Sequence, residues 1–429
     1  MSLAKKVVVG AGWVLVGDTS SQVLAFVLNV ILARLLMPED FGSVAIVASL
    51  VAVLQILGEL GIPVAVVQKK ELNEQTLHNA FWLTLFSTIL VSLALGFASS
   101  GFSFFFKNNE LKGLIRVAAL SFLFRGMYSF CNCLLLRAMS YRAIALIRLV
   151  GVLASGVFSV ILAIKGFGAY SIVWGQVISG VVMLFLGWSL IDYQPTFCLV
   201  ISEIWELFSF GLWVSINRLL NNFAGKVDAM IIGRTIGSSE LGEYFLAQRL
   251  MLVLPSLLNG ALDQVLLPAY SRLQGSPEKI ERAYWDSLVF SLLFTLPPVC
   301  LIFLFSDELV FLLYGSKWIN TAPLMKIMSI FAFASCLGGG IFGSALYSQG
   351  KPKAMTIVSA FRVIALPTCL LIGSTRGVSG IAWGFAIYGI IGRFFNQIVL
   401  RFSLGYPLAL FFRKISGPLV ASVFVTIVS

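Results

Sequence analysis

Long apolar runs recur along the whole chain, and they restrict its fold more than any other feature of the sequence. Many of the runs reach twenty residues with few charges, and one helical crossing of a bilayer needs about 20 residues. Charged residues make up only 11% of the chain, whereas a soluble protein carries about 25%. Membrane-barrel strands alternate in polarity and need only about 10 residues. The sequence therefore predicts an all-α polytopic membrane protein.

Counting the apolar runs predicts about twelve transmembrane helices. They cover residues 11–36, 41–67, 80–105, 114–136, 143–165, 168–191, 209–236, 242–268, 285–305, 322–347, 354–373 and 378–402. A further stretch, "SGPLVASVFVTIVS" at 416–429, predicts an extra partial helix, which at this length is too short to span.

Basic residues between these runs predict the orientation. The N-terminus and the even-numbered connections carry thirteen Lys and Arg, and the odd-numbered connections carry five. Because positive charge stays on the cytoplasmic side, we expect a multi-pass protein with a cytoplasmic N-terminus. This bias, together with charges inside the membrane, accounts for the net charge of +11, so we expect no nucleic acid partner.

The chain repeats itself after about 200 residues. "ILARLLMPEDFG" at 31–42 matches "IIGRTIGSSELG" at 231–242, and "GFGAYSIVWG" at 166–175 matches "TRGVSGIAWG" at 375–384. Six crossings per copy make the two copies parallel, and transporters built this way place their substrate path between the halves. The repeat predicts four segments: a six-helix bundle at 1–191, a cytoplasmic amphipathic linker at 192–208, a second six-helix bundle at 209–402 and a C-terminal segment at 403–429.

The best-matched part of the repeat predicts a structural turn on the outer side of each half. An acidic residue falls in the first turn of the following helix, where the helix dipole favours it, and a basic residue falls near the end of the preceding helix. The Gly two residues after the acid allows close packing. The six residues of this motif are Arg34, Asp40, Gly42, Arg234, Glu240 and Gly242.

Ionisable side chains inside the crossings predict a wet cavity. Such a group at mid-membrane costs about 2.5–3.5 kcal/mol, so it faces water or a partner. The anion-binding candidates are Arg125, Arg218, Lys226, Arg249 and Arg362, and the polar or ion-coupling candidates are Asp18, Gln22, Asn29, Glu59, Asn221, Asp228 and Asp263. Surplus Arg suits an anionic cargo. The alternative is internal ion pairs such as Asp18–Arg218 or Lys226–Asp228, with Arg116, Lys326 and Arg393 extending to the interface.

Prolines and glycines inside the runs predict broken helices. Pro63, Pro255, Pro297 with Pro298, and Pro367 each interrupt a predicted crossing, and "CLGGGIFGSA" places four Gly in another. The single His, His78, falls in a short connection, where we expect a solvated surface residue. The sequence contains no metal-ligand spacing and no nucleotide-binding glycine loop, so we expect no metal site and no cofactor.

Three stretches carry a family resemblance: "ILARLLMPEDFGSVAIV", "GELGIPVAVVQKKELNEQTLHNAFWLTL" and "VDAMIIGRTIGSSELGEYFLAQRL". With them the chain resembles bacterial polysaccharide transporters, the Wzx-type oligosaccharide flippases of the multidrug/oligosaccharidyl-lipid/polysaccharide (MOP) exporter superfamily. The resemblance implies a MATE-like protein of two bundles in the bacterial inner membrane. It would move a polyprenyl-diphosphate-linked oligosaccharide (O-antigen, capsule or exopolysaccharide repeat unit) to the periplasmic leaflet by alternating access.

The resemblance also implies partners and an energy source. These are an anionic lipid-linked oligosaccharide, membrane lipid, and a polymerase with a chain-length regulator, around a monomeric transporter. Coupling to H+ or Na+ would use Asp18, Glu59, Asp228 or Asp263.

Three other functions stay open from the sequence. A cation-coupled multidrug exporter on the same fold would have an acidic or aromatic cavity, which the Arg surplus disfavours. A lipid II flippase fits the same pattern. A membrane enzyme of glycan assembly, such as a polymerase or ligase, needs a large outer loop with paired catalytic groups, and the outer connections here are short. We therefore expect a transporter and not an enzyme.

Overall fold

The computed structural model describes residues 3–69, 73–197, 200, 205, 215, 219, 225–273 and 275–428. Contacts between residues divide the chain into two compact units, Met1–Ser239 and Glu240–Ser429. Within the described residues every regular element is a helix. A bilayer favours this outcome, because a helix satisfies its backbone hydrogen bonds within one segment.

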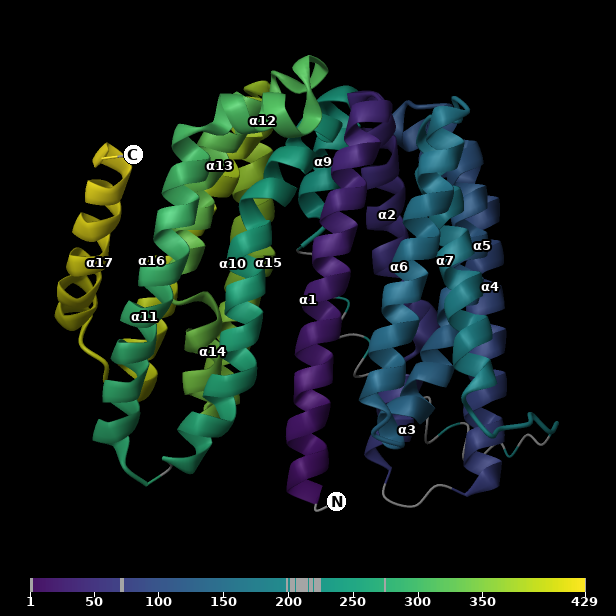
Figure 1. The fold of residues 1–429 in the computed structure, drawn as a ribbon, viewed down its shortest axis with the longest axis horizontal. Helices are drawn as coiled ribbons and strands as arrows, with labels where there is room; N and C mark the ends of the chain where they lie inside the picture. Colours follow the sequence, from purple (N-terminus) through teal and green to yellow (C-terminus); the bar gives the residue numbers. More distant parts are fainter. Residues whose placement is uncertain are drawn as a thin grey trace. The chain divides into compact units, whose positions relative to one another are not determined.

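The first unit packs its helices around α5 (Figure 1). Its helices are α1 (Leu3–Leu35), α2 (Pro38–Glu59), α3 (Ile62–Gln68), α4 (Glu74–Phe106), α5 (Glu110–Arg137), α6 (Tyr141–Ile164), α7 (Ala169–Ser189) and α9 (Val227–Thr235). Helix α5 contacts α2, α3, α4, α6 and α7, while α1 packs on α6. Small residues allow this close packing, since a Cβ added at Gly126 of α5 would collide with Thr88 of α4.

The second unit contains the remaining helices. They are α10 (Ser238–Arg272), which begins just before the unit boundary, α11 (Pro277–Leu304), α12 (Ser306–Tyr314), α13 (Thr321–Cys336), α14 (Gly339–Ser348), α15 (Pro352–Ser374), α16 (Gly377–Leu404) and α17 (Leu408–Val428), with a 3₁₀ turn at Ser316–Trp318. Helix α16 packs on both α13 and α15, and α17 packs on α11. The predicted division into a first bundle at 1–191, a linker at 192–208 and a second bundle at 209–402 stays a prediction.

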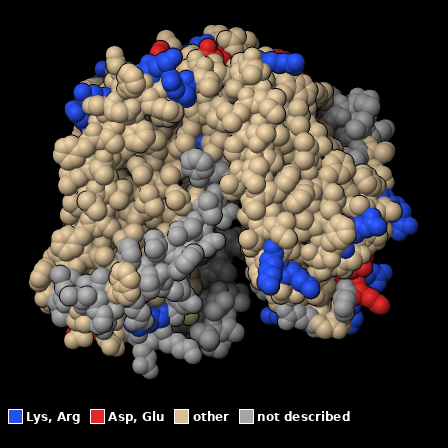
Figure 2. Space-filling view, turned by 180° about the vertical axis from the view of Figure 1, so that it is seen from behind, with Lys and Arg blue, Asp and Glu red and all other residues tan. Residues whose placement is uncertain are grey.

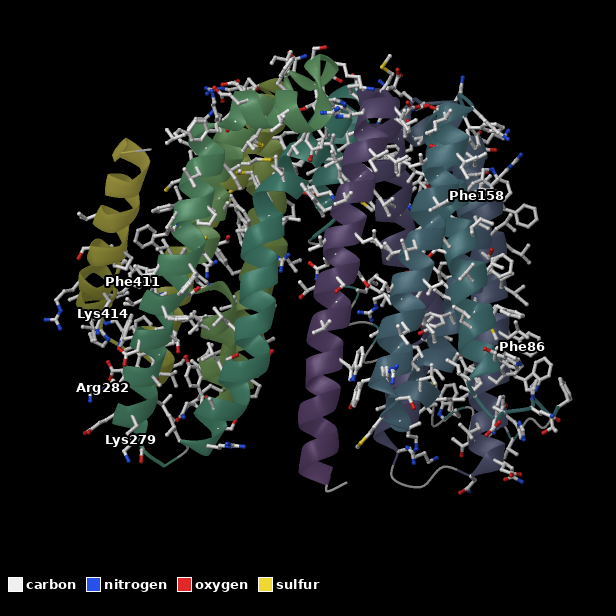
Figure 3. All side chains as sticks on the ribbon, viewed as in Figure 1. Phe86, Phe158, Lys279, Arg282, Phe411 and Lys414 are labelled. Atoms are coloured by element: carbon white, nitrogen blue, oxygen red, sulfur yellow. The ribbon has the colours of Figure 1, made fainter. Side chains whose placement is uncertain are left out.

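Among the described residues, ten helical segments are long and apolar enough to cross a membrane. They are Val16–Leu35, Pro38–Glu59, Glu74–Phe106, Glu110–Arg137, Tyr141–Ile164, Ala169–Ser189, Glu278–Leu304, Thr321–Ser348, Pro352–Ser374 and Gly377–Leu404. On the face seen in Figure 2, Lys and Arg gather at the upper edge and in the lower half, with uncharged surface between them. The exposed side chain of Phe86 points outward from α4 (Figure 3). These features are those of a multi-pass membrane protein.

The helices break at left-handed residues and not at most of the prolines. The predicted crossing 41–67 ends as α2 at Glu59, because Leu60 and Gly61 both have positive φ, and α3 starts beside Pro63. The crossing predicted at 322–347 likewise divides between α13 and α14 at Gly338, whose φ is 97°.

The expectation that Pro255, Pro297 with Pro298, and Pro367 interrupt their helices is wrong. Helices α10, α11 and α15 run through these residues as continuous segments. Neighbouring helices and local adjustment in a membrane bundle satisfy the carbonyl groups that a proline leaves without a donor.

The end of the chain also differs from expectation. Residues 416–428 belong to α17, which begins at Leu408 and has 21 residues, or roughly 30 Å at about 1.5 Å per residue. The partial helix was therefore predicted too short, because Arg413 and Lys414 interrupted the apolar run. In Figure 3, Lys414 of α17 lies on the same lower part of the second unit as Lys279 and Arg282 of α11.

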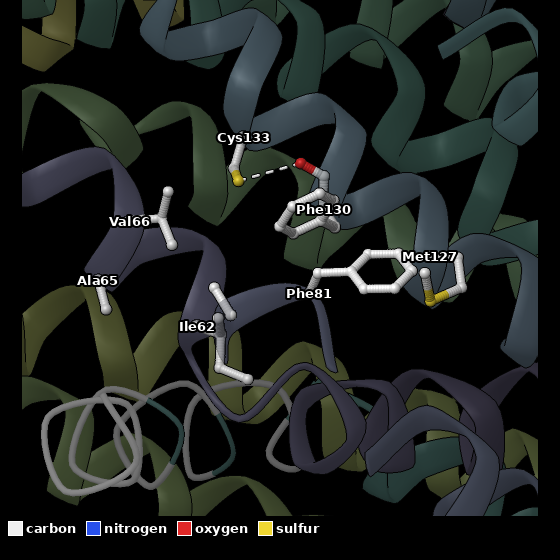
Figure 4. Close-up of a cluster of buried hydrophobic side chains, with 8 residues drawn as sticks. Ile62, Ala65, Val66, Phe81, Met127, Phe130 and Cys133 are labelled. Carbon is white, nitrogen blue, oxygen red and sulfur yellow. Dashed lines mark hydrogen bonds between the residues drawn. The ribbon is translucent and has the colours of Figure 1, made fainter. Parts of the chain in front are cut away.

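His78 is not the solvated residue that the sequence suggested. Its Nδ1 lies 2.9 Å from the Tyr193 hydroxyl and its Nε2 lies 2.7 Å from Thr196 Oγ1. These contacts fasten the segment after α7 to the start of α4, and burial raises the pKa of Tyr193 to about 12. Beneath them lies the apolar cluster of Figure 4, where Phe81 and Phe130 meet edge to face.

Candidate functional site

A polar cavity of about 360 Å³ opens inside the first unit, between α2, α5, α6 and α7. Its lining combines two guanidinium groups, one carboxylate, amides and hydroxyls. The lining residues are Gln55, Glu59, Arg125, Tyr128, Ser129, Asn132, Arg148, Val152, Ser179 and Met183. Two of them, Arg125 and Glu59, belong to the predicted site.

Helical spacing explains why these residues share one cavity. Helices α2, α6 and α7 each contribute a pair of residues four positions apart, and α5 contributes Arg125, Tyr128, Ser129 and Asn132. Residues three, four and seven positions apart lie on one face of a helix. The four helices pack on one another, so their inward faces converge on a single space.

The cavity lies between the middle of the bundle and one of its ends. Arg125 stands near the middle of α5, whereas Glu59 is the last residue of α2. Arg148 lies about two turns after the start of α6. The three charged side chains therefore span part of the depth of the first unit.

The carboxylate of the cavity has a hydrogen-bond partner, whereas two other polar atoms of its lining have none. Gln55 Nε2 donates to Glu59 Oε1 at 3.0 Å, which fixes the carboxylate. In the described part of the chain, Arg125 Nε and Asn132 Oδ1 are enclosed and have no hydrogen-bond partner. A buried donor without an acceptor is destabilising by about 1–3 kcal/mol, so a ligand that accepts a hydrogen bond there would gain this energy.

Arg148 connects the cavity to α1. Its guanidinium forms an ion pair with Asp18, and the two side chains remain 43% and 36% exposed. The sequence suggested Arg218 as a partner for Asp18, but Asp18 pairs with Arg148. Sequence reasoning missed Arg148, although an Arg inside the predicted crossing 143–165 was a signal of the same kind as Arg125.

The other predicted polar residues of α1 do not reach this cavity. Gln22 is exposed, and Asn29 donates to Ala25 O of its own helix at 2.5 Å.

At the start of α9, Asp228 is buried and accepts from Ala229 N at 2.8 Å, while Lys226 is half-buried in the preceding turn.

Three predicted site residues cannot be placed. Arg218 and Asn221 lie outside the described residues, and Asp263 lies on α10 with a side chain that is also outside them.

Three arginines in the helices of the second unit have tyrosines among their electrostatic neighbours. Arg362 of α15 and Arg393 of α16 are both within electrostatic range of Tyr388, and Arg249 of α10 is within range of Tyr314. Arg393 does not extend to the interface as expected, because its Nε is enclosed. Lys326 forms an ion pair with Asp307, and Arg116 is exposed.

Asp40 of the turn motif accepts two backbone hydrogen bonds. Its Oδ2 accepts from Met37 N and its Oδ1 accepts from Ala169 N, both at 2.9 Å. Asp40 therefore joins the start of α2 to the start of α7. A Cβ at Gly42 would collide with the Ser238 carbonyl, so the close packing expected at this glycine is present.

The second copy of the motif differs in its contacts. Arg234 lies in the last turn of α9, and its Cζ is 5.1 Å from the ring centroid of Phe105 in α4. Glu240 stands in the first turn of α10 and Gly242 is buried. Arg34 occupies the last turn of α1, as predicted.

Ionisable residues around a cavity inside a helical membrane bundle mark a pathway for a substrate or an ion. This architecture is typical of polytopic membrane transport proteins. The sequence model of the polysaccharide biosynthesis protein family matches residues 31–323 of this chain. The chain belongs to this family.

Individual relatives agree with this assignment. The lipopolysaccharide biosynthesis protein WzxC of Escherichia coli strain K12 is 23% identical over 403 residues, which cover 93% of this chain and 82% of the relative. The succinoglycan biosynthesis transport protein ExoT of Rhizobium meliloti strain 1021 is 26% identical over 329 residues, covering 76% of this chain and 66% of the relative.

A solved structure shows the fold. The lipid II flippase MurJ in its inward closed conformation superposes with a TM-score of 0.78 at 15% identity, covering 96% of this chain and 92% of that one. A solved structure of a MATE family transporter, described as a member of the MOP superfamily, also superposes with a TM-score of 0.70 at 16% identity. The predicted all-α membrane fold, like that of MurJ and MATE proteins, is confirmed.

Proposed function

We propose that this protein is a flippase that moves a polyprenyl-diphosphate-linked oligosaccharide from the cytoplasmic to the periplasmic leaflet by alternating access. The observation that carries the proposal is the cavity with Arg125 and Arg148, inside a membrane protein of a polysaccharide biosynthesis family. A diphosphate supplies acceptors that match guanidinium donors. Relatives named as biosynthesis and transport proteins support the same cargo class.

The proposal includes a location and an orientation. The thirteen-to-five distribution of basic residues supports a cytoplasmic N-terminus in a bacterial inner membrane. In that orientation the cavity, which reaches the end of α2 and lies near the start of α6, belongs to the cytoplasmic half of the first unit. Cargo made in the cytoplasm would meet it there.

Transport without catalysis also forms part of the proposal. The polar groups of the cavity can bind and orient an anion, and none of them needs to form a covalent bond with it. Energy would come from a proton or sodium gradient through a carboxylate such as Glu59, which lines the cavity and is fixed by Gln55. A polymerase and a chain-length regulator would act on the delivered cargo.

Cells test this function directly. A strain that lacks the protein is complemented with the wild type or with Arg125→Gln, and surface glycan and lipid-linked oligosaccharide are measured. We expect the deletion and Arg125→Gln to lose surface glycan and to accumulate the lipid-linked unit on the cytoplasmic leaflet. Normal surface glycan in the deletion strain contradicts the proposal, and a block in peptidoglycan synthesis instead would identify lipid II as the cargo.

A further inference from the structure

Arg148 occupies two environments at once. It lines the polar cavity together with Arg125, and it forms an ion pair with Asp18 of α1, which does not line that cavity. We propose that Arg125 and Arg148 form a subsite for one phosphate-class anion, and that Asp18 is a built-in competitor that shares Arg148 with this anion. The inference rests on the proposed function only for the identity of the anion as the diphosphate of the cargo.

Arg125 is the fixed part of the subsite. It projects from the middle of α5, the helix that contacts five others in the first unit. Its enclosed Nε has no acceptor among the described residues, and a guanidinium presents its donors in a rigid fork that fits phosphate. Hydroxyl groups of Tyr128 and Ser129 lie on the same face of α5 and add donors.

The cavity has the size and the charge for such an anion. Its volume of about 360 Å³ exceeds by far the roughly 30 Å³ share of one water molecule, so a phosphate group with its hydration fits. Two guanidinium groups face one carboxylate, that of Glu59. The lining therefore has a surplus of one positive charge, and Asp18 supplies the balancing charge from outside the cavity.

Asp18 keeps Arg148 paired while the subsite is empty. An unpaired guanidinium within a membrane bundle is unfavourable, and the pair with Asp18 avoids that state. Protein atoms leave 43% and 36% of the two side chains uncovered, so packing does not enclose the pair. An arriving anion can therefore replace Asp18 on Arg148, and the return of Asp18 favours release, which a transporter needs as much as binding.

Calorimetric titration of the full-length protein in detergent with inorganic pyrophosphate tests the subsite. We expect Arg125→Gln and Arg148→Gln each to weaken pyrophosphate binding about tenfold or more. Asp18→Asn should strengthen binding by roughly three- to tenfold. Because Asp18 acts only through Arg148, the double variant Asp18→Asn with Arg148→Gln should match Arg148→Gln alone.

Two controls separate binding from folding. Arg116→Gln removes an exposed Arg from the same helix as Arg125 and should leave binding within about twofold of wild type. Arg125→Lys and Arg148→Lys keep the charge without the fork, and they should bind with intermediate affinity as monodisperse protein. Unchanged pyrophosphate affinity in both Gln variants, or unchanged or weaker binding in Asp18→Asn, overturns the inference.

The source of the anion is tested separately. A water-soluble prenyl diphosphate should displace pyrophosphate from the wild type and lose affinity in the same Arg variants. If pyrophosphate binds as expected while the prenyl diphosphate does not compete and surface glycan is normal in Arg125→Gln cells, the subsite stands and the proposed cargo is wrong. Loss of glycan export with unchanged pyrophosphate affinity supports the flippase function and overturns the subsite.

Discussion

The two units place the arginines of their helices in different surroundings. In the first unit, Arg125 and Arg148 line a polar cavity with Glu59 and amides. In the second unit, Arg393 is enclosed near Tyr284 and Tyr388. Arg393 also lines a space of about 290 Å³, and every other residue that lines this space is apolar.

Related halves can therefore diverge in what their interiors bind. A guanidinium in a polar cavity, with an enclosed Nε that has no acceptor among the described residues, suits a ligand that binds and leaves. Arg393 Nε is likewise enclosed without a hydrogen-bond partner among the described residues, but its neighbours include tyrosines. One of them, Tyr284, accepts from Gln397 Nε2 at 3.4 Å, and the space that Arg393 lines is otherwise apolar. We therefore expect cargo contact in the first unit and a structural role for Arg393 in the second.

The largest effect is expected at Arg125. Arg125→Met removes the fixed guanidinium from the cavity but keeps a long apolar stem, so glycan export should fall about tenfold or more with protein amount unchanged. Quantitative surface-glycan staining against immunoblot level measures this. Wild-type export in Arg125→Met cells would show that Arg125 does not contribute to cargo transport.

The next effect concerns the anchoring of the first unit. Asp40→Ala removes the acceptor for Met37 N and Ala169 N, and loss of a helix-capping acceptor destabilises by about 1–2 kcal/mol. The thermal midpoint of the purified protein should fall by several degrees. Glu39→Ala, an exposed acid in the same helical turn, is the matched control and should shift the midpoint far less.

Arg393→Met should act with the opposite sign or hardly at all. A well-packed apolar side chain in place of a buried charge is often neutral or stabilising, by about 1 kcal/mol or more. We expect a thermal midpoint equal to or above that of wild type and export within about twofold of it. A strong export defect with an unchanged midpoint would show that the second unit also contacts cargo.

The smallest effect is expected at an exposed ion pair of the second unit. Lys414 Nζ of α17 lies 3.7 Å from Asp286 Oδ1 of α11, with side chains 37% and 63% exposed. Lys414→Ala should change stability by less than about 0.5 kcal/mol, because the apolar contacts of buried Phe411 and Ile415 hold α17 on α11. A large fall in the thermal midpoint would show that charge, and not packing, holds this helix.

Local sequence features predicted much of the fold. The acid in the first turn of α2 follows from residues within a few positions of one another. The prediction failed where two local rules competed. Pro297 and Pro298 suggested a break, but the bundle tolerates them inside α11, whereas Gly338 and the pair Leu60 and Gly61 ended their helices through positive φ.

The candidate site was only partly predictable for a different reason. Arg125 and Glu59 were detectable as charges within apolar runs, and their shared cavity was not. Arg148 and Asp18 are 130 positions apart, so no periodicity connects them. His78 similarly gained its partners from a segment more than a hundred residues away.

By itself, the sequence determined that this chain is a helical membrane protein with an internal repeat, buried charge and a likeness to polysaccharide transporters. Hydropathy and helical spacing are properties of neighbouring residues, and the bilayer converts them directly into helices. Only the tertiary structure decided which charges meet. That depends on how α1, α2, α5 and α6 pack, and the packing sets whether a guanidinium faces a carboxylate, a tyrosine or an open cavity.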